Sequence, residues 1–134
     1  MDIGVIIFTL LENLTGTNIG SKIRPDIAAQ ADTLPFIIYR QDDRNNFNTK
    51  NSSGGVGKFS VNISCYADDR TEAQMIGGKV REVLERYSGT PDGVTGQTVQ
   101  NVYFMNESSD YIDNNDIQSA VKTLSFDFWL KSTT

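Results

Sequence analysis

The chain has 134 residues and a formal net charge of −5, with 38% hydrophobic and 22% charged residues. A chain of this length can hold a core without disulfides, and this composition is that of a globular protein, not a disordered one. The acidic balance argues against stable nucleic-acid binding, which depends on neutralising phosphates. We therefore expect one globular domain over residues 1–134, with a charge that favours solubility.

The reactive residue types are scarce. Cys65 is the one cysteine and there is no histidine, which excludes an intrachain disulfide and the Cys–His and Ser–His catalytic pairs. Because Cys65 lies in an alternating apolar run, we expect a buried structural thiol. The acidic clusters at 42–43, 68–69 and 110–116 match no calcium-loop spacing. The sequence therefore predicts no catalytic residues, no cofactor and no metal site.

The N-terminal third predicts one helix and two extended segments. The apolar residues from Ile3 to Leu11 follow Asp2 and recur at helical spacing, which predicts a buried helix over about 2–13. This run is too short for a membrane span of ~20 residues and lacks the basic start of a signal peptide. Residues 19–27 contain Pro25, which favours an edge strand or an extended connection. Pro35 then opens a strand over 36–41.

Residues 42–57 are rich in Asn, Ser and Gly and poor in apolar side chains. Such a segment cannot bury enough surface to offset the entropy lost on ordering, so we expect a long mobile loop. It is either a plain hairpin connection or a segment that becomes ordered on a partner. Arg40, Arg44, Lys50 and Lys58 make this zone locally basic, and Phe47 is its one large apolar residue. These five residues are the candidate interface with another subunit or with a partner protein.

The rest of the chain predicts two further strand regions around a second helix. Residues 58–66 alternate apolar and polar residues and predict a half-buried strand. Asp69 and Glu72 fit a capping box at the start of a helix whose apolar face reaches Tyr87, before Ser88, Gly89 and Pro91. Residues 97–107 and 117–131 predict strands, separated by a polar, acidic loop over 108–116. Gly77 and Gly78 within the helix indicate close packing against a neighbouring element or subunit.

This order of elements predicts the α+β class. We expect a two-layer sandwich: a mainly antiparallel sheet of about four to five strands, with two helices packed on one face. The other face would be polar, with Tyr66 and Trp129 near its ends. The polar residues expected there are Lys58, Ser60, Asn62, Ser64, Thr123, Ser125 and Asp127.

Three short segments carry a family resemblance. They are "Leu34-Pro35-Phe36-Ile37-Ile38-Tyr39", the strand end "Ser64-Cys65-Tyr66-Ala67" before the long helix, and the closing "Leu124-Ser125-Phe126-Asp127-Phe128-Trp129". With the N-terminal apolar helix, their order and spacing over nearly the whole chain resemble the tail-completion proteins of long-tailed bacteriophages. These proteins are also called tail terminator or tail-to-head joining proteins.

The resemblance implies a non-enzymatic structural protein of the virion. It would cap the finished tail tube as a ring, typically a hexamer, and present the other ring face to the head connector. Its expected partners are other copies of itself, the major tail tube protein and a head connector or head-completion protein. It would be monomeric in solution and form its ring on the tail tip. DNA would pass through without specific binding, and no membrane is involved.

Two other readings remain open on the residues alone. One is a head-completion or minor structural protein of the virion, which binds the head connector instead of the tail tube. The other is a small α+β ligand-binding module, which would need a defined pocket and would not form rings. An enzyme built on paired carboxylates is disfavoured by the lack of a matching motif. The expected location is the head–tail interface of a virion, after synthesis in the host cytoplasm.

Overall fold

The computed structural model describes residues 3–12, 22–25, 34–47, 56–91, 97–114 and 117–132. At 42–47, 56, 112–114, 117–118 and 132 it describes the backbone alone. The elements, in chain order, are α1 (Ile3–Leu11), β1 (Ile23–Pro25), β2 (Phe36–Phe47), β3 (Val56–Ala67), α2 (Arg70–Leu84), β4 (Gln97–Asn114) and β5 (Ile117–Ser132).

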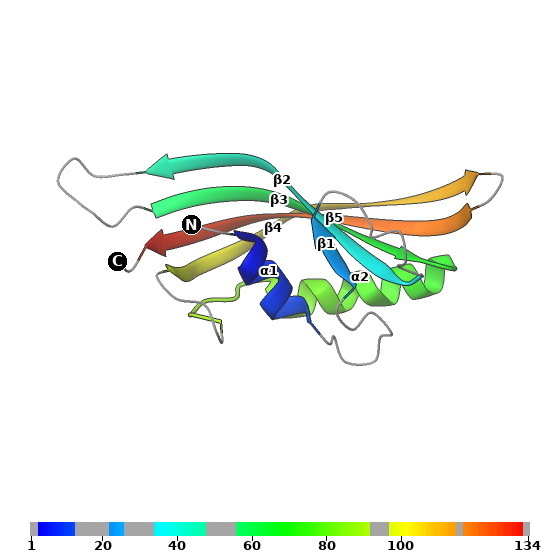
Figure 1. Cartoon of the computed structure of the whole chain (residues 1–134), viewed down its shortest axis with the longest axis horizontal. Coiled ribbons are helices and arrows are strands. Elements are labelled where there is room, and N and C mark those ends of the chain that lie inside the picture. Colours follow the sequence, from blue (N-terminus) through cyan, green and yellow to red (C-terminus); the bar gives the residue numbers. More distant parts are fainter. Residues whose placement is uncertain are drawn as a thin grey trace.

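The five strands form one sheet in the order β1-β2-β3-β5-β4 (Figure 1). β1 pairs with β2 in parallel, and the other three pairings are antiparallel. The two helices lie on the same side of the sheet (Figure 1). The predicted α+β class, with a mainly antiparallel sheet and two helices on one face, is confirmed. Within residues 19–27, the described Ile23–Pro25 form the first strand of the sheet, which confirms the edge-strand alternative for that part.

The core lies between the sheet and the helices. β3 and β5 are adjacent in the sheet, with Ile63 opposite Leu124 and Val61 opposite Phe126, and all four side chains are buried. Ile76, on the apolar stripe of α2, is buried in the same core cluster. At its start, the Asp69 carboxylate accepts a hydrogen bond from the Glu72 N–H at 2.7 Å, which confirms the predicted N-cap.

The strands of both hairpins are longer than the apolar pattern predicts. β2 continues through 42–47 and β3 begins at Val56, so only 48–55 remains of the loop expected over 42–57, and that part lies outside the described residues. Likewise β4 continues to Asn114, so the loop expected over 108–116 is wrong for most of its length. The reason is backbone pairing: a polar strand is stabilised by ladder hydrogen bonds with its neighbour, which hydropathy does not reveal.

The two hairpins project in opposite directions. Figure 1 shows the paired ends of β2 and β3 at one end of the long axis and the paired ends of β4 and β5 at the other. Each outer strand has a register shift partway along it, between Gln41 and Asp43 in β2 and between Phe104 and Asn106 in β4. Such bulges bend a strand and increase its twist. The hairpin ends are therefore separate arms, carried by a common body.

A second shift in β4, between Val99 and Asn101, corrects the predicted faces of that strand. Simple alternation places Val99 on the face of Tyr103 and Met105, opposite Val102. In the structure Val99 and Val102 are both buried, because the extra residue at the bulge resets the alternation.

α2 also ends earlier than its apolar pattern, at Leu84. Glu85 leaves the helical conformation, and Arg86 has a positive φ of 63°. The Arg86 N–H donates to the Val102 carbonyl at 2.8 Å, which ties the end of α2 to β4. Neither helix in the described part of the chain has the length and apolar content needed to cross a membrane.

Candidate assembly surface

The face of the sheet away from the helices is polar, as predicted, and its side chains are linked across β3 and β5. Ser60 donates to Asp127 at 2.9 Å, Ser125 donates to Asn62 at 2.5 Å, and Ser64 and Thr123 lie 3.2 Å apart. All six side chains are half-buried. Across β3 and β5 these mutually bonded hydroxyl, amide and carboxylate groups leave little apolar area to drive docking.

The five predicted interface residues are not all described. Arg40 is exposed on β2, and the Lys58 ammonium lies 3.9 Å from the Asp127 carboxylate, with a third of its side chain exposed. Arg44 and Phe47 have their backbones in β2, but their side chains are outside the described set, and Lys50 is outside it entirely. Arg40 and Lys58 lie on the polar face, opposite Asn62 and Asn45 respectively. The structure therefore places Arg44 and Phe47 in a strand where a loop was expected.

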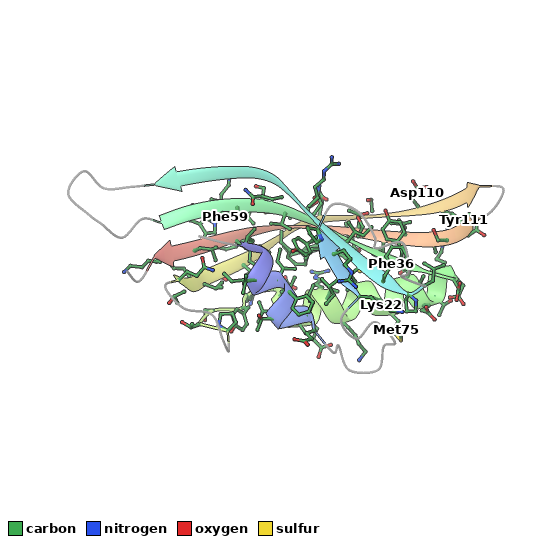
Figure 2. The ribbon with its side chains drawn as sticks, viewed as in Figure 1. Lys22, Phe36, Phe59, Met75, Asp110 and Tyr111 are labelled. Atoms are coloured by element: carbon green, nitrogen blue, oxygen red, sulfur yellow. The ribbon has the colours of Figure 1, made fainter. Side chains whose placement is uncertain are left out.

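The outer edge of β4 is the surface that the sequence did not predict. β5 is the one strand next to β4 in the described sheet. Near the body, the segment after α2 covers this edge: Gly89 exchanges two backbone hydrogen bonds with Val99, and Arg86 donates to Val102. Beyond that point every described side chain from Met105 to Tyr111 is exposed. Figure 2 shows Asp110 and Tyr111 near the far end of this arm.

Charge on the β4 edge is of one sign. Its 18 residues include no Lys or Arg and carry Glu107, Asp110 and Asp113. Lys122 of β5 compensates part of this charge. Its ammonium lies 3.5 Å from the Glu107 carboxylate and 3.4 Å from the Ser109 hydroxyl. Glu107 keeps 43% of its side chain exposed, so the arm still presents acidic groups to solvent.

Apolar side chains stand beside this acidic stretch. Tyr103 and Met105 are 50% and 55% exposed. With Trp129 and Asp127 they line an open hollow of about 750 Å³ on the outer face of β4 and β5. Aromatic and Met side chains are enriched in protein interfaces, whereas a small-molecule site is usually enclosed. This hollow is therefore better suited to a protein contact than to a small ligand.

Among the described residues, the side chains with reactive or metal-binding groups do not form a catalytic or metal-binding arrangement. Cys65 is fully buried, and burial raises the pKa of its thiol to about 12, which confirms a structural thiol. Among the residues that the structure describes, no group of three or more His, Cys, Asp or Glu side chains is arranged to hold a metal ion. Arg81 stacks 3.9 Å from the Phe104 ring centre and contacts Glu85 at 2.9 Å, a surface arrangement that fastens α2 to β4.

Comparison with known proteins gives one kind of match. No family model and no curated protein matches the chain. Among solved structures, it is similar to a chain in the virion of a native gene transfer agent particle, with a TM-score of 0.62 and 15% sequence identity. The match covers 95% of this chain and 85% of that one. At this identity the similarity shows a shared fold over nearly the whole length.

Proposed function

We propose that this chain is a non-enzymatic structural protein of a virion, of the tail-completion type. It caps the tail tube as a hexameric ring and provides the surface on which the head connector docks. The observation that carries the proposal is the fold shared with a chain of the virion of a gene transfer agent particle, over 95% of this chain. The segments that resemble tail-completion proteins support the same reading independently.

The physical features agree with an assembly role. The outer sheet face is occupied by mutually bonded polar groups. Three of the five exposed large apolar side chains among the described residues, Tyr103, Met105 and Tyr111, lie along β4, and the hollow beside Tyr103 and Met105 is open. A protein that works by contacting neighbours needs exposed strand edges and side chains of this kind, whereas an enzyme needs converging reactive groups.

The proposal is tested in the particles themselves. An affinity-tagged copy of the chain is expressed in the cell that produces the particles, and purified particles are examined by mass spectrometry and immunogold electron microscopy. We expect label at one end of the tail, where it meets the head. Disruption of the gene should give separate heads and unjoined tails. Label on the head of a tailless particle would favour the head-completion alternative, and absence from particles would refute both.

A further inference from the structure

We propose that Lys122 selects the register in which the outer part of β4 pairs with β5. Its contact with Glu107 keeps the bulge between Phe104 and Asn106 in place. It thereby determines which side chains of the β4–β5 arm, residues 106–114 and 117–125, face each side of the sheet. This inference goes beyond the proposed function, because it concerns the chain alone and is tested on the purified protein.

The first step is that Lys122 is the exception in an apolar row. The buried, helix-facing residues of β5 are Ala120, Lys122, Leu124, Phe126, Phe128 and Leu130. Lys122 is the one charged residue among these six. Apolar side chains of similar size often stabilise a buried site as well as an ion pair does, so packing alone does not explain a lysine here. The best-attested role of such buried polar groups is to specify a register.

The second step is that Lys122 itself is held in place. It lies opposite Cys65 of β3, in a pairing that runs from Val56 to Ala67 without a register shift. On the helix side, a Cβ atom at Gly77 would fall 2.7 Å from Cγ of Lys122, so the aliphatic stem runs directly beneath α2. The position of the ammonium group is therefore set by β3 and α2, independently of β4.

The third step is that the outer part of β4 is held by fewer contacts. The segment after α2 bonds to β4 at Val99 and Val102, which both precede the bulge at Phe104. Past this bulge, β5 is the strand that pairs with β4 in the described sheet. Asn106–Asn114 has no apolar alternation. The register of such a strand is weakly specified by burial.

A second register is available to this part of β4. As observed, Ser108 is opposite Thr123. Without the bulge, the pairing of Phe104 with Phe126 would continue regularly and place Ser108 opposite Lys122. The connection to β5 would then have three residues, where the observed pairing of Asn114 with Ile117 leaves two, and both lengths are common in hairpins. Backbone pairing and turn length therefore do not exclude the shifted register.

The fourth step is the charge that the observed register brings to Lys122. The Glu107 carboxylate lies 3.5 Å from the Lys122 ammonium group, which is also 3.4 Å from the Ser109 hydroxyl. Arg81 of α2 interacts with the same carboxylate. Its hydrogen bond to Glu85 raises the pKa of Arg81 most, and the charge of Glu107 adds to that effect. Glu107 therefore serves two cations that belong to the body of the protein.

The shifted register would remove this partner from both cations. The place of Glu107, opposite Leu124, would pass to the neutral side chain of Asn106, and Glu107 would turn to the other face. Asp110 would reach the helix-facing side, but nearer the end of the hairpin, whereas the Lys122 ammonium group points toward the body, at Glu107. Opposite charges across a strand pair stabilise it, so this difference favours the observed register.

The register decides which side chains a partner protein would meet. As observed, Asn106 and Ser108 share the outer face with Ser125 and Thr123. A shift by one residue would exchange the faces of all side chains from 106 onward. Lys122 thus controls a surface from beneath α2, where no partner reaches it.

The main test moves the carboxylate by one residue. The double variant Asn106→Glu/Glu107→Asn leaves the composition unchanged, but its carboxylate meets Lys122 only in the shifted register. Nuclear Overhauser effects between backbone protons of β4 and β5 report the register in the purified chain. The natural chain should show contacts between 106 and 125 and between 108 and 123. The double variant should instead show contacts between 106 and 124 and between 108 and 122.

Two single variants remove a charge without moving it. Lys122→Met keeps a long unbranched side chain beneath α2, and Glu107→Gln changes a side chain that is 43% exposed. Each should show the contacts of both registers. Asp110→Asn removes another charge of the same strand and should show the natural register alone. Contacts between 63 and 124 report the pairing of β3 with β5 and verify in every variant that the body is folded.

A folded double variant that keeps the natural register would overturn the proposal. The natural register alone in both Lys122→Met and Glu107→Gln would do so too, because the ion pair would then have no effect on pairing. Mixed registers in Asp110→Asn would assign the effect to the net charge of the arm and not to Lys122. If Lys122→Met fails to fold, Glu107→Gln and the double variant still decide. None of these results bears on the location of the chain in particles, so the proposed function is tested separately.

Discussion

Gly77 of α2 lies directly over the side chain of Lys122 on β5. A Cβ atom at residue 77 would fall 2.7 Å from Cγ of Lys122 and 3.4 Å from Cδ1 of Leu124. Lys122 is 9% exposed, so its aliphatic stem runs beneath the helix before the ammonium reaches Glu107. The glycine allows this close approach. The sequence left open whether the glycine packs against an element of the same chain or against another subunit, and the structure shows a strand of the same chain.

The adjacent glycine provides a matched comparison. Gly78 has no heavy atom within 4 Å of a Cβ placed on it. We predict that Gly78→Ala raises the free energy of unfolding by up to about 1 kcal/mol, from helix propensity alone. Gly77→Ala should lower it by about 1–3 kcal/mol, because the Lys122 stem is displaced. Urea denaturation followed by circular dichroism measures both, and equal stabilisation by the two variants would contradict the packing argument.

The core contacts give a second prediction. Phe126 is fully buried and packs edge-on against Phe104 and Phe128, with ring centres 5.7 and 6.3 Å apart. Phe126→Ala and Ile63→Ala should each lower the free energy of unfolding by about 2–5 kcal/mol, through lost burial and the cavity left behind. Ser60→Ala on the polar face, which removes the hydrogen bond to Asp127, should cost about 1 kcal/mol. A similar loss in all three variants would mean that the two faces do not differ in packing.

Much of this core follows from the sequence, because β3 and β5 alternate apolar and polar residues without interruption. Ile63 and Phe126 are buried as that alternation predicts, and Ser60 and Asp127 lie on the opposite face. A period of two identifies a strand and its buried face only when one face is apolar. Those two strands meet this condition. The helix α2 that covers them also has one apolar face, with its apolar residues at helical spacing.

The candidate surface is harder to predict for the same reason. Residues 42–47 and 108–114 have no apolar alternation, and their strand structure depends on pairing with β3 and β5. Pairing partners far apart in sequence are not visible in local composition. The bulge between Val99 and Asn101 also places Val99 on the buried face of Val102, against the expected alternation. For 108–114, the residues that could have suggested a continuing strand are Tyr111 and Ile112, which have high β propensity and lie in a polar segment without Gly or Pro.

The thiol of Cys65 gives a prediction about pH. Burial raises its pKa from 9.0 to about 12, with a smaller opposing effect of Lys122. The unfolded chain therefore loses the thiol proton at lower pH than the folded chain. The contribution of the buried Cys65 thiol to the free energy of unfolding is full below pH 9 and declines as pH rises toward 12. The stability difference between the natural chain and Cys65→Ala should narrow over this window. Urea denaturation at several pH values measures it, and a constant difference would contradict a buried, protonated thiol.

Chemical reactivity offers a separate check on the same residue. A thiol-specific reagent at pH 8 should fail to modify the native protein and should react fully once it is unfolded, since the thiolate is the reactive form. Rapid labelling of the native protein would show that Cys65 is accessible. Cys65→Ala should leave particle assembly unchanged, because a structural thiol makes no contact with partners.

The last prediction concerns the segment between β2 and β3. Phe47 and Val56 are opposite each other, so replacing residues 48–55 by Asn-Gly would close the hairpin with a two-residue turn of the favoured type. We expect the free energy of unfolding to change little, because the strand ladder is retained and long loops add little stability. We expect joining of tails to heads to be lost, since Lys50, one of the five candidate interface residues, and the polar residues around it would be removed. A variant in which 48–55 is replaced by eight Gly and Ser residues separates loss of the natural side chains from loss of segment length. If it also fails to join tails to heads, the natural residues are required for contact; if it succeeds, length alone matters. Normal joining by the two-residue variant, once shown to be folded, would leave 48–55 as a plain connection.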